Sequence, residues 1–166
     1  IPLVSDMTSN FLSRPGKVSK FGVIIAGSQK NIGPAGLVIV IVREDLLGNA
    51  GAQVPSLYNY SVQNNERSLY NTPPTFTWYM AGLVFKWIKK QGGIFAMESN
   101  SERRSSKLYE AIDKSDFYAN PIEQKFRSRM NVPFTLKDEG LNESFLIDAQ
   151  EAGLMELKGH RSVGGM

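Results

Sequence analysis

The chain of 166 residues is 42% hydrophobic and 21% charged, which is ordinary for a globular protein and excludes a disordered chain. Its 19 basic and 16 acidic side chains leave a net charge of only +3, spread along the sequence, so we expect no nucleic acid and no membrane among its partners. There is no cysteine, which excludes disulfides and thiolate metal sites and suits a cytoplasmic location.

The first part of the chain predicts three strands, at residues 1–5, 21–26 and 37–42. The second and third are rich in valine and isoleucine on both faces, which is typical of a mainly parallel sheet covered by helices on both sides. Between them, residues 27–36 form a polar loop rich in turn formers. Residues 48–69 are polar and aperiodic, and we expect an extended loop there.

A helix is predicted after Asn71-Thr72-Pro73-Pro74, where a capping residue precedes a proline suited to the first helical position. Apolar residues continue at helical spacing up to Ile88, and Gly92-Gly93 ends the pattern. The predicted pattern changes at these two glycines, from buried strands to alternating helix and strand. We therefore expect one domain at residues 1–93 and a second at residues 94–166.

The second part alternates helix and strand. A mostly polar helix is expected over residues 95–114, and a shorter one near 142–152 that stops at Gly153. Strands are expected at residues 130–134 and 154–157. The expected fold class is thus α/β, with a piece of a helix-covered sheet followed by a smaller α+β part.

Lys30 stands in the glycine-rich loop that follows the second strand. A lysine held near a carbonyl and partly desolvated can form a Schiff base with it. The alternative is a solvated loop lysine, which is the usual state of this residue type. The loop lacks the order of residues of a P-loop, so it does not predict nucleotide binding.

Three other positions carry both a chemical and a plain structural interpretation. Asp6 follows the first strand, where open α/β sheets present ligand-binding groups, although aspartate is also a common turn former. Asn71 and Thr72 are explained as helix caps, and the free N–H groups of a helix start also suit a phosphate.

The one histidine, His160, lies beside Arg161 in a glycine-containing segment. Arginine offers a bidentate fork to phosphate, so this pair predicts an anion site, whereas a lone surface histidine is the plain alternative. Residues 127–129 (Arg-Ser-Arg) are either a second anion patch or a solvated basic turn. The sequence has no cluster with metal-ligand spacing and no nucleophile elbow, so no metal is expected. From the patterns alone, the chain is part of an α/β protein with an anion site.

Several motifs in the same order resemble the phosphoserine aminotransferase family, whose members are class V, fold-type I enzymes that depend on pyridoxal 5′-phosphate. The motifs cover nearly the whole chain: residues 4–9 and 12–15, 22–47 with AGSQKNIGPAG at its centre, 68–74, 127–134 and 157–166. The resemblance implies that the chain is the C-terminal half of such an enzyme, with a partial large domain and a truncated small domain.

The resemblance also implies roles for the candidate residues. Lys30 would bind pyridoxal 5′-phosphate covalently, Asp6 would pair with its pyridine nitrogen, and Gln29 would bond its phosphate. The cofactor phosphate of the other subunit of a homodimer would be reached by Asn71 and Thr72. The phosphate of the substrate would be bound by His160 and Arg161.

The implied reaction is ping-pong transamination from glutamate to 3-phosphohydroxypyruvate, giving 2-oxoglutarate and phosphoserine in serine biosynthesis. In bacteria the family often also serves pyridoxine biosynthesis, which the sequence leaves open here. We expect the 166-residue chain alone to be inactive, because catalysis needs the whole set of groups. The alternatives are another fold-type I aminotransferase of small amino acids, and a non-catalytic α/β fragment.

Overall fold

The computed structural model describes residues 1–160 and 164–166. The chain forms two compact units, residues 1–99 and residues 100–166. Whether these units correspond to the expected domains of residues 1–93 and 94–166 stays a prediction. Among the residues that the structure describes, no helix combines the length and the apolar character needed to cross a bilayer.

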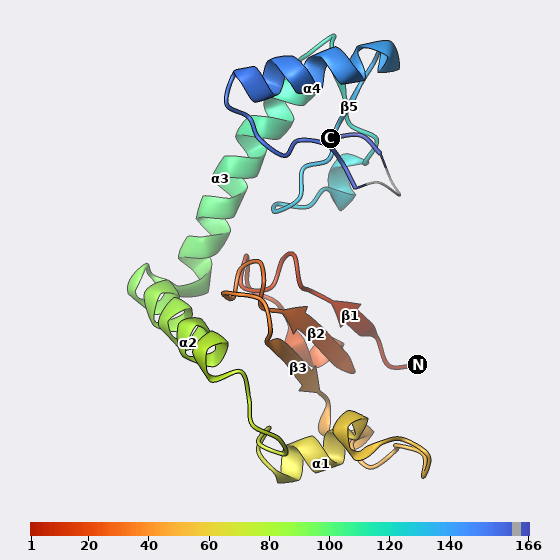
Figure 1. Cartoon of the computed structure of the whole chain (residues 1–166), viewed down its shortest axis with the longest axis vertical. Helices are drawn as coiled ribbons and strands as arrows, with labels where there is room; N and C mark the ends of the chain where they lie inside the picture. The colour runs from red at the N-terminus through yellow and green to blue at the C-terminus, as the bar shows by residue number, and fades with distance from the viewer. Residues whose placement is uncertain (161–163) are drawn as a thin grey trace. The chain divides into compact units, whose positions relative to one another are not determined.

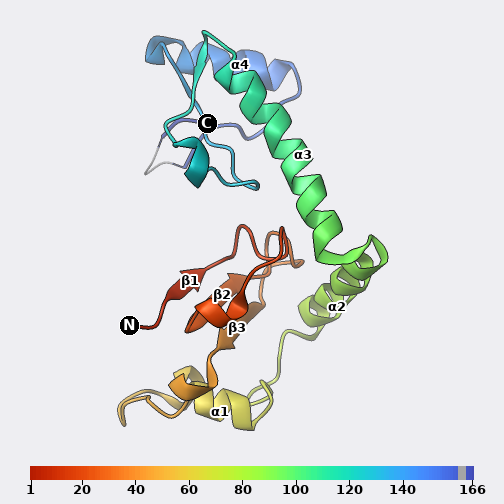
Figure 2. The same cartoon turned by 180° about the vertical axis from the view of Figure 1, so that it is seen from behind.

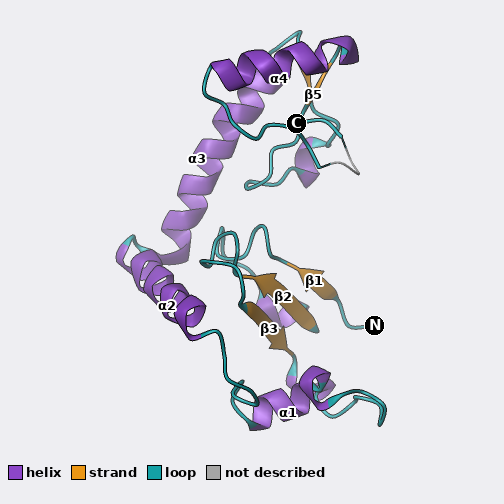
Figure 3. Cartoon of the chain, viewed as in Figure 1, coloured by secondary structure: helices purple, strands orange, loops and turns teal. Residues whose placement is uncertain are grey.

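The first unit is built around a three-stranded sheet of β1 (Val4–Asp6), β2 (Val23–Gly27) and β3 (Val38–Val42), in that order (Figures 1 and 3). The α/β fold class and the three strands are confirmed. β1 pairs with β2 in parallel, whereas β2 pairs with β3 in antiparallel fashion. The second pairing follows from the connection, because residues 28–37 contain no crossover helix and the chain turns straight back.

The predicted helix after the tandem prolines is α2 (Thr75–Lys90), which ends before Gly92 as expected. It buries Ala81 against Ala26 of β2 and Ile32 of the loop between β2 and β3, and all three side chains are fully buried. The Thr77 hydroxyl donates to the Ala35 carbonyl at 3.2 Å. The loop that carries Lys30 is therefore part of the core of this unit.

Two predictions between β3 and α2 are wrong. Residues 48–69 are not simply extended, because they contain a 3-10 turn at Ser56–Tyr58 and helix α1 (Tyr60–Asn65), which the Asn59 side chain caps. Asn71 and Thr72 do not cap α2, whose N-cap is Pro74 without a side-chain cap bond. A residue before proline is held in the extended region, so the helix begins only after the second proline.

The second unit contains the end of the long helix α3 (Gly93–Asp113), the antiparallel strands β4 (Tyr118–Ala119) and β5 (Thr135–Leu136), and α4 (Asn142–Glu151). Both predicted helices are confirmed, and Figure 2 shows them from behind. The predicted strands at residues 130–134 and 154–157 are wrong, since β5 starts just after the first and the second has no strand structure. Additional 3-10 turns lie at Val18–Lys20, Glu44–Leu46, Gln124–Phe126 and Glu139–Leu141.

An aromatic cluster joins β4, the segment before β5 and α4 in the second unit. Tyr118 of β4 meets Phe134 edge-on at 5.4 Å between ring centroids and Phe145 of α4 at 5.9 Å. Phe117 completes the group with an edge contact to Tyr118 at 5.0 Å. This cluster packs the segment at Phe134 against α4.

Candidate active site

The loop that carries Lys30 is held by a fully buried serine at its start. The Ser28 backbone N–H donates to the Leu37 carbonyl at 2.9 Å, and the Ser28 carbonyl accepts from the Gly33 N–H at 2.7 Å. The Ser28 hydroxyl donates to the carbonyl of Pro34. These bonds close the loop on itself, so the exposed Lys30 side chain rises from a fixed backbone.

The loop is also bonded to the segment that follows β1. The Asn31 amide donates to the Phe11 carbonyl at 2.9 Å, and the next residue, Ile32, is fully buried. The two ends of β1 and β2 are bridged by Thr8, whose hydroxyl accepts from the Gly27 N–H at 3.0 Å. The two parallel strands thus end side by side, and the segments after them are joined by side chains.

The structure brings Asp6 and Lys30 to the same end of the sheet. Asp6 is the last residue of β1, and its Oδ1 accepts from the Thr8 N–H at 2.8 Å. The Lys30 Nζ donates to Ser9 Oγ at 2.6 Å. The pKa of Asp6 is lowered, first by the Thr8 hydroxyl, then by the Thr8 N–H, and to a smaller extent by the charge of Lys30. Asp6 is therefore an ionised carboxylate within electrostatic reach of the lysine.

Gln29 is exposed, and its side chain folds back over Gly27 at the end of β2. A Cβ placed on Gly27 would meet the Gln29 Cδ and Nε2 at 3.0 Å. The missing side chain at Gly27 thus leaves room for the Gln29 carboxamide. This keeps an amide donor and acceptor close to the base of the Lys30 loop.

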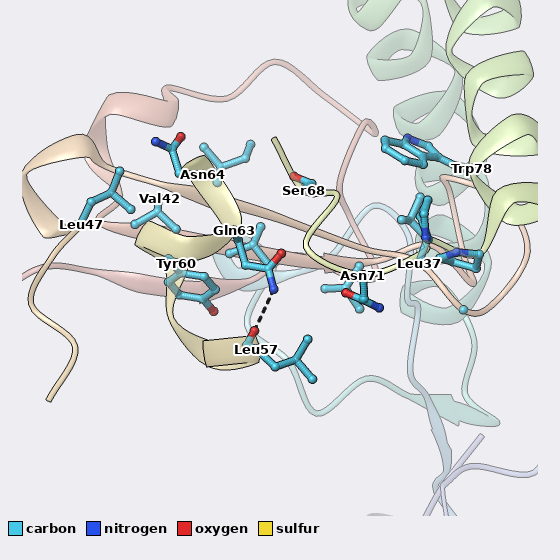
Figure 4. A pocket seen from close by; sticks show the side chains of 16 residues that line it. Leu37, Val42, Leu47, Leu57, Tyr60, Gln63, Asn64, Ser68, Asn71 and Trp78 are labelled. Carbon is cyan, nitrogen blue, oxygen red and sulfur yellow. Dashed lines mark hydrogen bonds between the residues drawn. The ribbon is translucent and has the colours of Figure 1, made fainter. Parts of the chain in front are cut away.

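Asn71 lines a different feature of the same unit, a pocket of about 610 Å³ against β3, which Figure 4 shows from close by. Its walls come from β3, α1 and the start of α2, with Trp78 on the α2 side. Neither Asp6 nor Lys30 is among its lining residues. Thr72 is exposed next to Asn71. Of the loop that carries Lys30, only its last two residues line this pocket.

His160 stands at the base of a closed loop in the second unit. The Gly159 N–H donates to the Gly165 carbonyl at 2.7 Å, and the Gly164 N–H donates to the His160 carbonyl at 2.9 Å. A Cβ on Gly159 would come within 2.5 Å of the Gly165 oxygen, so only glycine permits this closure. Two backbone bonds between Met166 and Phe134 fix the loop to the aromatic cluster. Arg161 lies outside the described residues.

The interpretation of residues 127–129 as an anion patch or a solvated turn is wrong for Arg127. Its guanidinium forms a bidentate pair with the Asp113 carboxylate at 2.6 and 2.9 Å, and its side chain is only 13% exposed. It also lies 4.8 Å from the centre of the Tyr109 ring. The pair lowers the pKa of Asp113, mainly through the bonds from Arg127. Arg127 thus anchors the segment before Phe134 to the end of α3.

Thr8 and Ser9, to which the sequence assigned no role of their own, bond the groups of this site. Both hydroxyls contact groups that the chain brings together only through the pairing of β1 with β2. The available signal was two adjacent hydroxyl residues that begin two positions after the aspartate at the end of the strand. Among the described residues, no group of three His, Cys, Asp or Glu side chains is placed to hold a metal ion.

Comparison with known proteins identifies relatives along nearly the whole chain. The chain is 62% identical over 165 residues to phosphoserine aminotransferase from Hahella chejuensis, a match that covers 99% of this chain and 46% of that protein. It therefore spans about half the length of the curated relatives it matches.

Two solved structures share both sequence and fold with the chain. Phosphoserine aminotransferase from Bacillus circulans subsp. alkalophilus is 42% identical, with a TM-score of 0.93 over 100% of this chain and 46% of that one. A phosphoserine aminotransferase from Trichomonas vaginalis with bound PLP is 42% identical, with a TM-score of 0.91 over 99% of this chain and 48% of that one. The family model for class-V aminotransferases matches residues 1–164. The chain therefore belongs to the class-V aminotransferase family.

Proposed function

We propose that this chain supplies the lysine-bearing part of a phosphoserine aminotransferase that depends on pyridoxal 5′-phosphate. The observation that carries the proposal is the meeting of Asp6 and Lys30 at one end of the sheet, where Thr8 and Ser9 bond them. The names of the relatives at 58–62% identity support the same activity.

The residues at this site fit pyridoxal 5′-phosphate. Lys30 is an exposed amine on a fixed loop, Asp6 is a carboxylate kept ionised by its neighbours, and Gln29 is an adjacent amide. When bound, the cofactor supplies an aldehyde that receives the amino group and a ring that withdraws electrons. Asp6 would hold the ring nitrogen protonated, because a nearby carboxylate favours the charged form of a base.

In this proposal Lys30 has two tasks. Its amine carries the cofactor between turnovers. Once displaced, it takes the proton from the Cα of the amino donor as general base, and in the second half-reaction it gives a proton to the Cα of the new amino acid as general acid. The exposed position of Lys30 and its attachment to a rigid loop support both tasks, since the amine must move over a short range from a fixed backbone.

The substrates proposed are glutamate as amino donor and 3-phosphohydroxypyruvate as acceptor. His160 and Arg161 are the proposed ligands of the substrate phosphate, and the tight closure at Gly159 supports a fixed position for His160. Asn71 and Thr72 are proposed to bind the cofactor phosphate of a second subunit. Asn71 lines a pocket that includes neither Asp6 nor Lys30, which suits a homodimer in which each subunit completes the active site of the other. A cytoplasmic location and a second role in pyridoxine biosynthesis belong to the same proposal.

A comparison of amino donors tests the proposal on the intact protein that contains this chain. With phosphoserine as donor and 2-oxoglutarate as acceptor we expect rapid transamination, and with alanine or serine in place of phosphoserine we expect little. Equal rates with alanine would favour an aminotransferase of other small amino acids. No transamination with any donor would favour a non-catalytic fragment.

A further inference from the structure

The Lys30 ammonium is held by a neutral hydroxyl, although a carboxylate lies nearby. Its Nζ donates to Ser9 Oγ at 2.6 Å, while Asp6 accepts bonds from Thr8. The two charged groups thus have separate partners that are adjacent in the sequence. The Asp6 carboxylate therefore remains able to pair with another cation. The lysine amine has a defined position that does not depend on an ion pair with Asp6.

Ser9 is well placed to act as a fixed point. It is half-buried in a turn closed by backbone bonds from the Asn10 and Phe11 N–H groups to the Met7 carbonyl, at 3.0 and 2.7 Å. Lys30, in contrast, is exposed and ends a long side chain with four rotatable bonds. A hydroxyl on a rigid turn that bonds the amine removes much of this freedom.

We propose that Ser9 is a positioning residue for Lys30. The Ser9 hydroxyl holds the lysine amine at the end of the sheet where Asp6 lies whenever the lysine is not covalently bound. This inference rests on the proposed function, because it concerns the attack of the same amine on the aldehyde of pyridoxal 5′-phosphate. That attachment joins the lysine nitrogen to the aldehyde carbon and releases one water. An amine that already lies near its place of reaction attacks faster than one that must search for it.

The test uses the intact protein, freed of cofactor, as wild type, Ser9→Ala, Ser9→Thr and the control Ser106→Ala. Ser106 is an exposed serine on α3. The first readout is the rate of covalent attachment of pyridoxal 5′-phosphate to Lys30, followed by absorbance and mapped by borohydride reduction and mass spectrometry. The second is the affinity for pyridoxine 5′-phosphate, which has no aldehyde and therefore reports on the fold of the site alone.

We expect Ser9→Ala to slow attachment about three- to tenfold, because the variant loses one hydrogen bond to a charged but exposed group. Its affinity for pyridoxine 5′-phosphate should equal that of wild type, and Ser9→Thr, which keeps the hydroxyl, should restore the rate to within about twofold. Ser106→Ala should change neither readout.

Attachment by Ser9→Ala at the wild-type rate would overturn the inference. So would a parallel loss of affinity for the analogue, or slow attachment in Ser9→Thr, because each would point to general damage of the turn. If the wild-type protein does not attach the cofactor at Lys30 at all, the proposed function itself is wrong, and this outcome is distinct from the others.

Discussion

Replacing Gly159 with alanine should open the loop that begins at His160. The new Cβ would lie 2.5 Å from the Gly165 oxygen and 2.8 Å from its carbonyl carbon, and closer still to the Gly164 oxygen. These are backbone atoms, and they cannot relieve the clash by a change of side-chain rotamer. The bond from the Gly159 N–H to the Gly165 carbonyl must therefore lengthen or break.

The magnitude follows from the bonds at risk. One backbone hydrogen bond is worth about 0.5–1.5 kcal/mol, so losing this bond and the neighbouring one from Gly164 to His160 costs about 1–3 kcal/mol. If the closed loop is needed to bind the phosphorylated substrate, this converts to an increase in KM of about 5- to 150-fold. The value of kcat should change much less, since the groups at Lys30 are untouched.

The assay is steady-state transamination by the intact protein, with phosphoserine as the varied substrate. Gly51→Ala is the matched control, because a Cβ at Gly51 would meet nothing within 4 Å. It should leave KM and kcat as in wild type. A wild-type KM for phosphoserine in Gly159→Ala would refute the reasoning, as would an equal rise in Gly51→Ala.

Three further predictions concern the two units separately. Thr8→Val should raise the pKa of Asp6 toward its ordinary value, which a carboxyl NMR titration measures. The lowered pKa stabilises the fold above about pH 4, and this stabilisation is lost as the pH falls through the pKa of Asp6 in the folded protein, so the variant should lack it. An unchanged titration would contradict this. Ile32→Ala should lower the free energy of unfolding by about 2–5 kcal/mol in denaturant titration, because this side chain is fully buried, whereas a cost below about 1 kcal/mol would mean that the lysine loop is not part of the core. Arg127→Lys keeps the charge but loses the bidentate fork to Asp113, so hydrogen exchange should speed up near the end of α3; unchanged exchange there would show that the pair does not anchor this segment.

The parts of the fold that could be predicted from the sequence are those that depend on residues close together in the chain. The valine and isoleucine runs of β2 and β3, and the glycines that end α2, identify their elements without help from distant residues. Helix α1 was missed because six residues are too few to show a helical period. The start of α2 was misplaced because the second of two prolines, not Asn71, forms the boundary.

For the candidate site, the sequence could single out individual residues but could not predict which side chains contact one another. Lys30 and Asp6 stand out because Lys30 follows a strand and Asp6 ends one, and parallel pairing of β1 with β2 then brings them to the same edge of the sheet. The bond between Lys30 and Ser9 joins residues far apart in the sequence, and it becomes visible only when the two turns are in place. The pairing of Arg127 with Asp113 was hidden for the same reason, since a basic cluster in the sequence does not reveal which arginine is neutralised.

The proposed function depends on the Lys30 amine as the group that carries the cofactor. The most direct measurement is borohydride reduction of the intact protein after addition of pyridoxal 5′-phosphate, followed by peptide mapping, with Lys30→Ala as the control. We expect a phosphopyridoxyl group on the peptide containing Lys30, and none on any lysine of the variant at the same cofactor concentration. Stoichiometric labelling of a different lysine in the wild-type protein, with Lys30 unmodified, would contradict it.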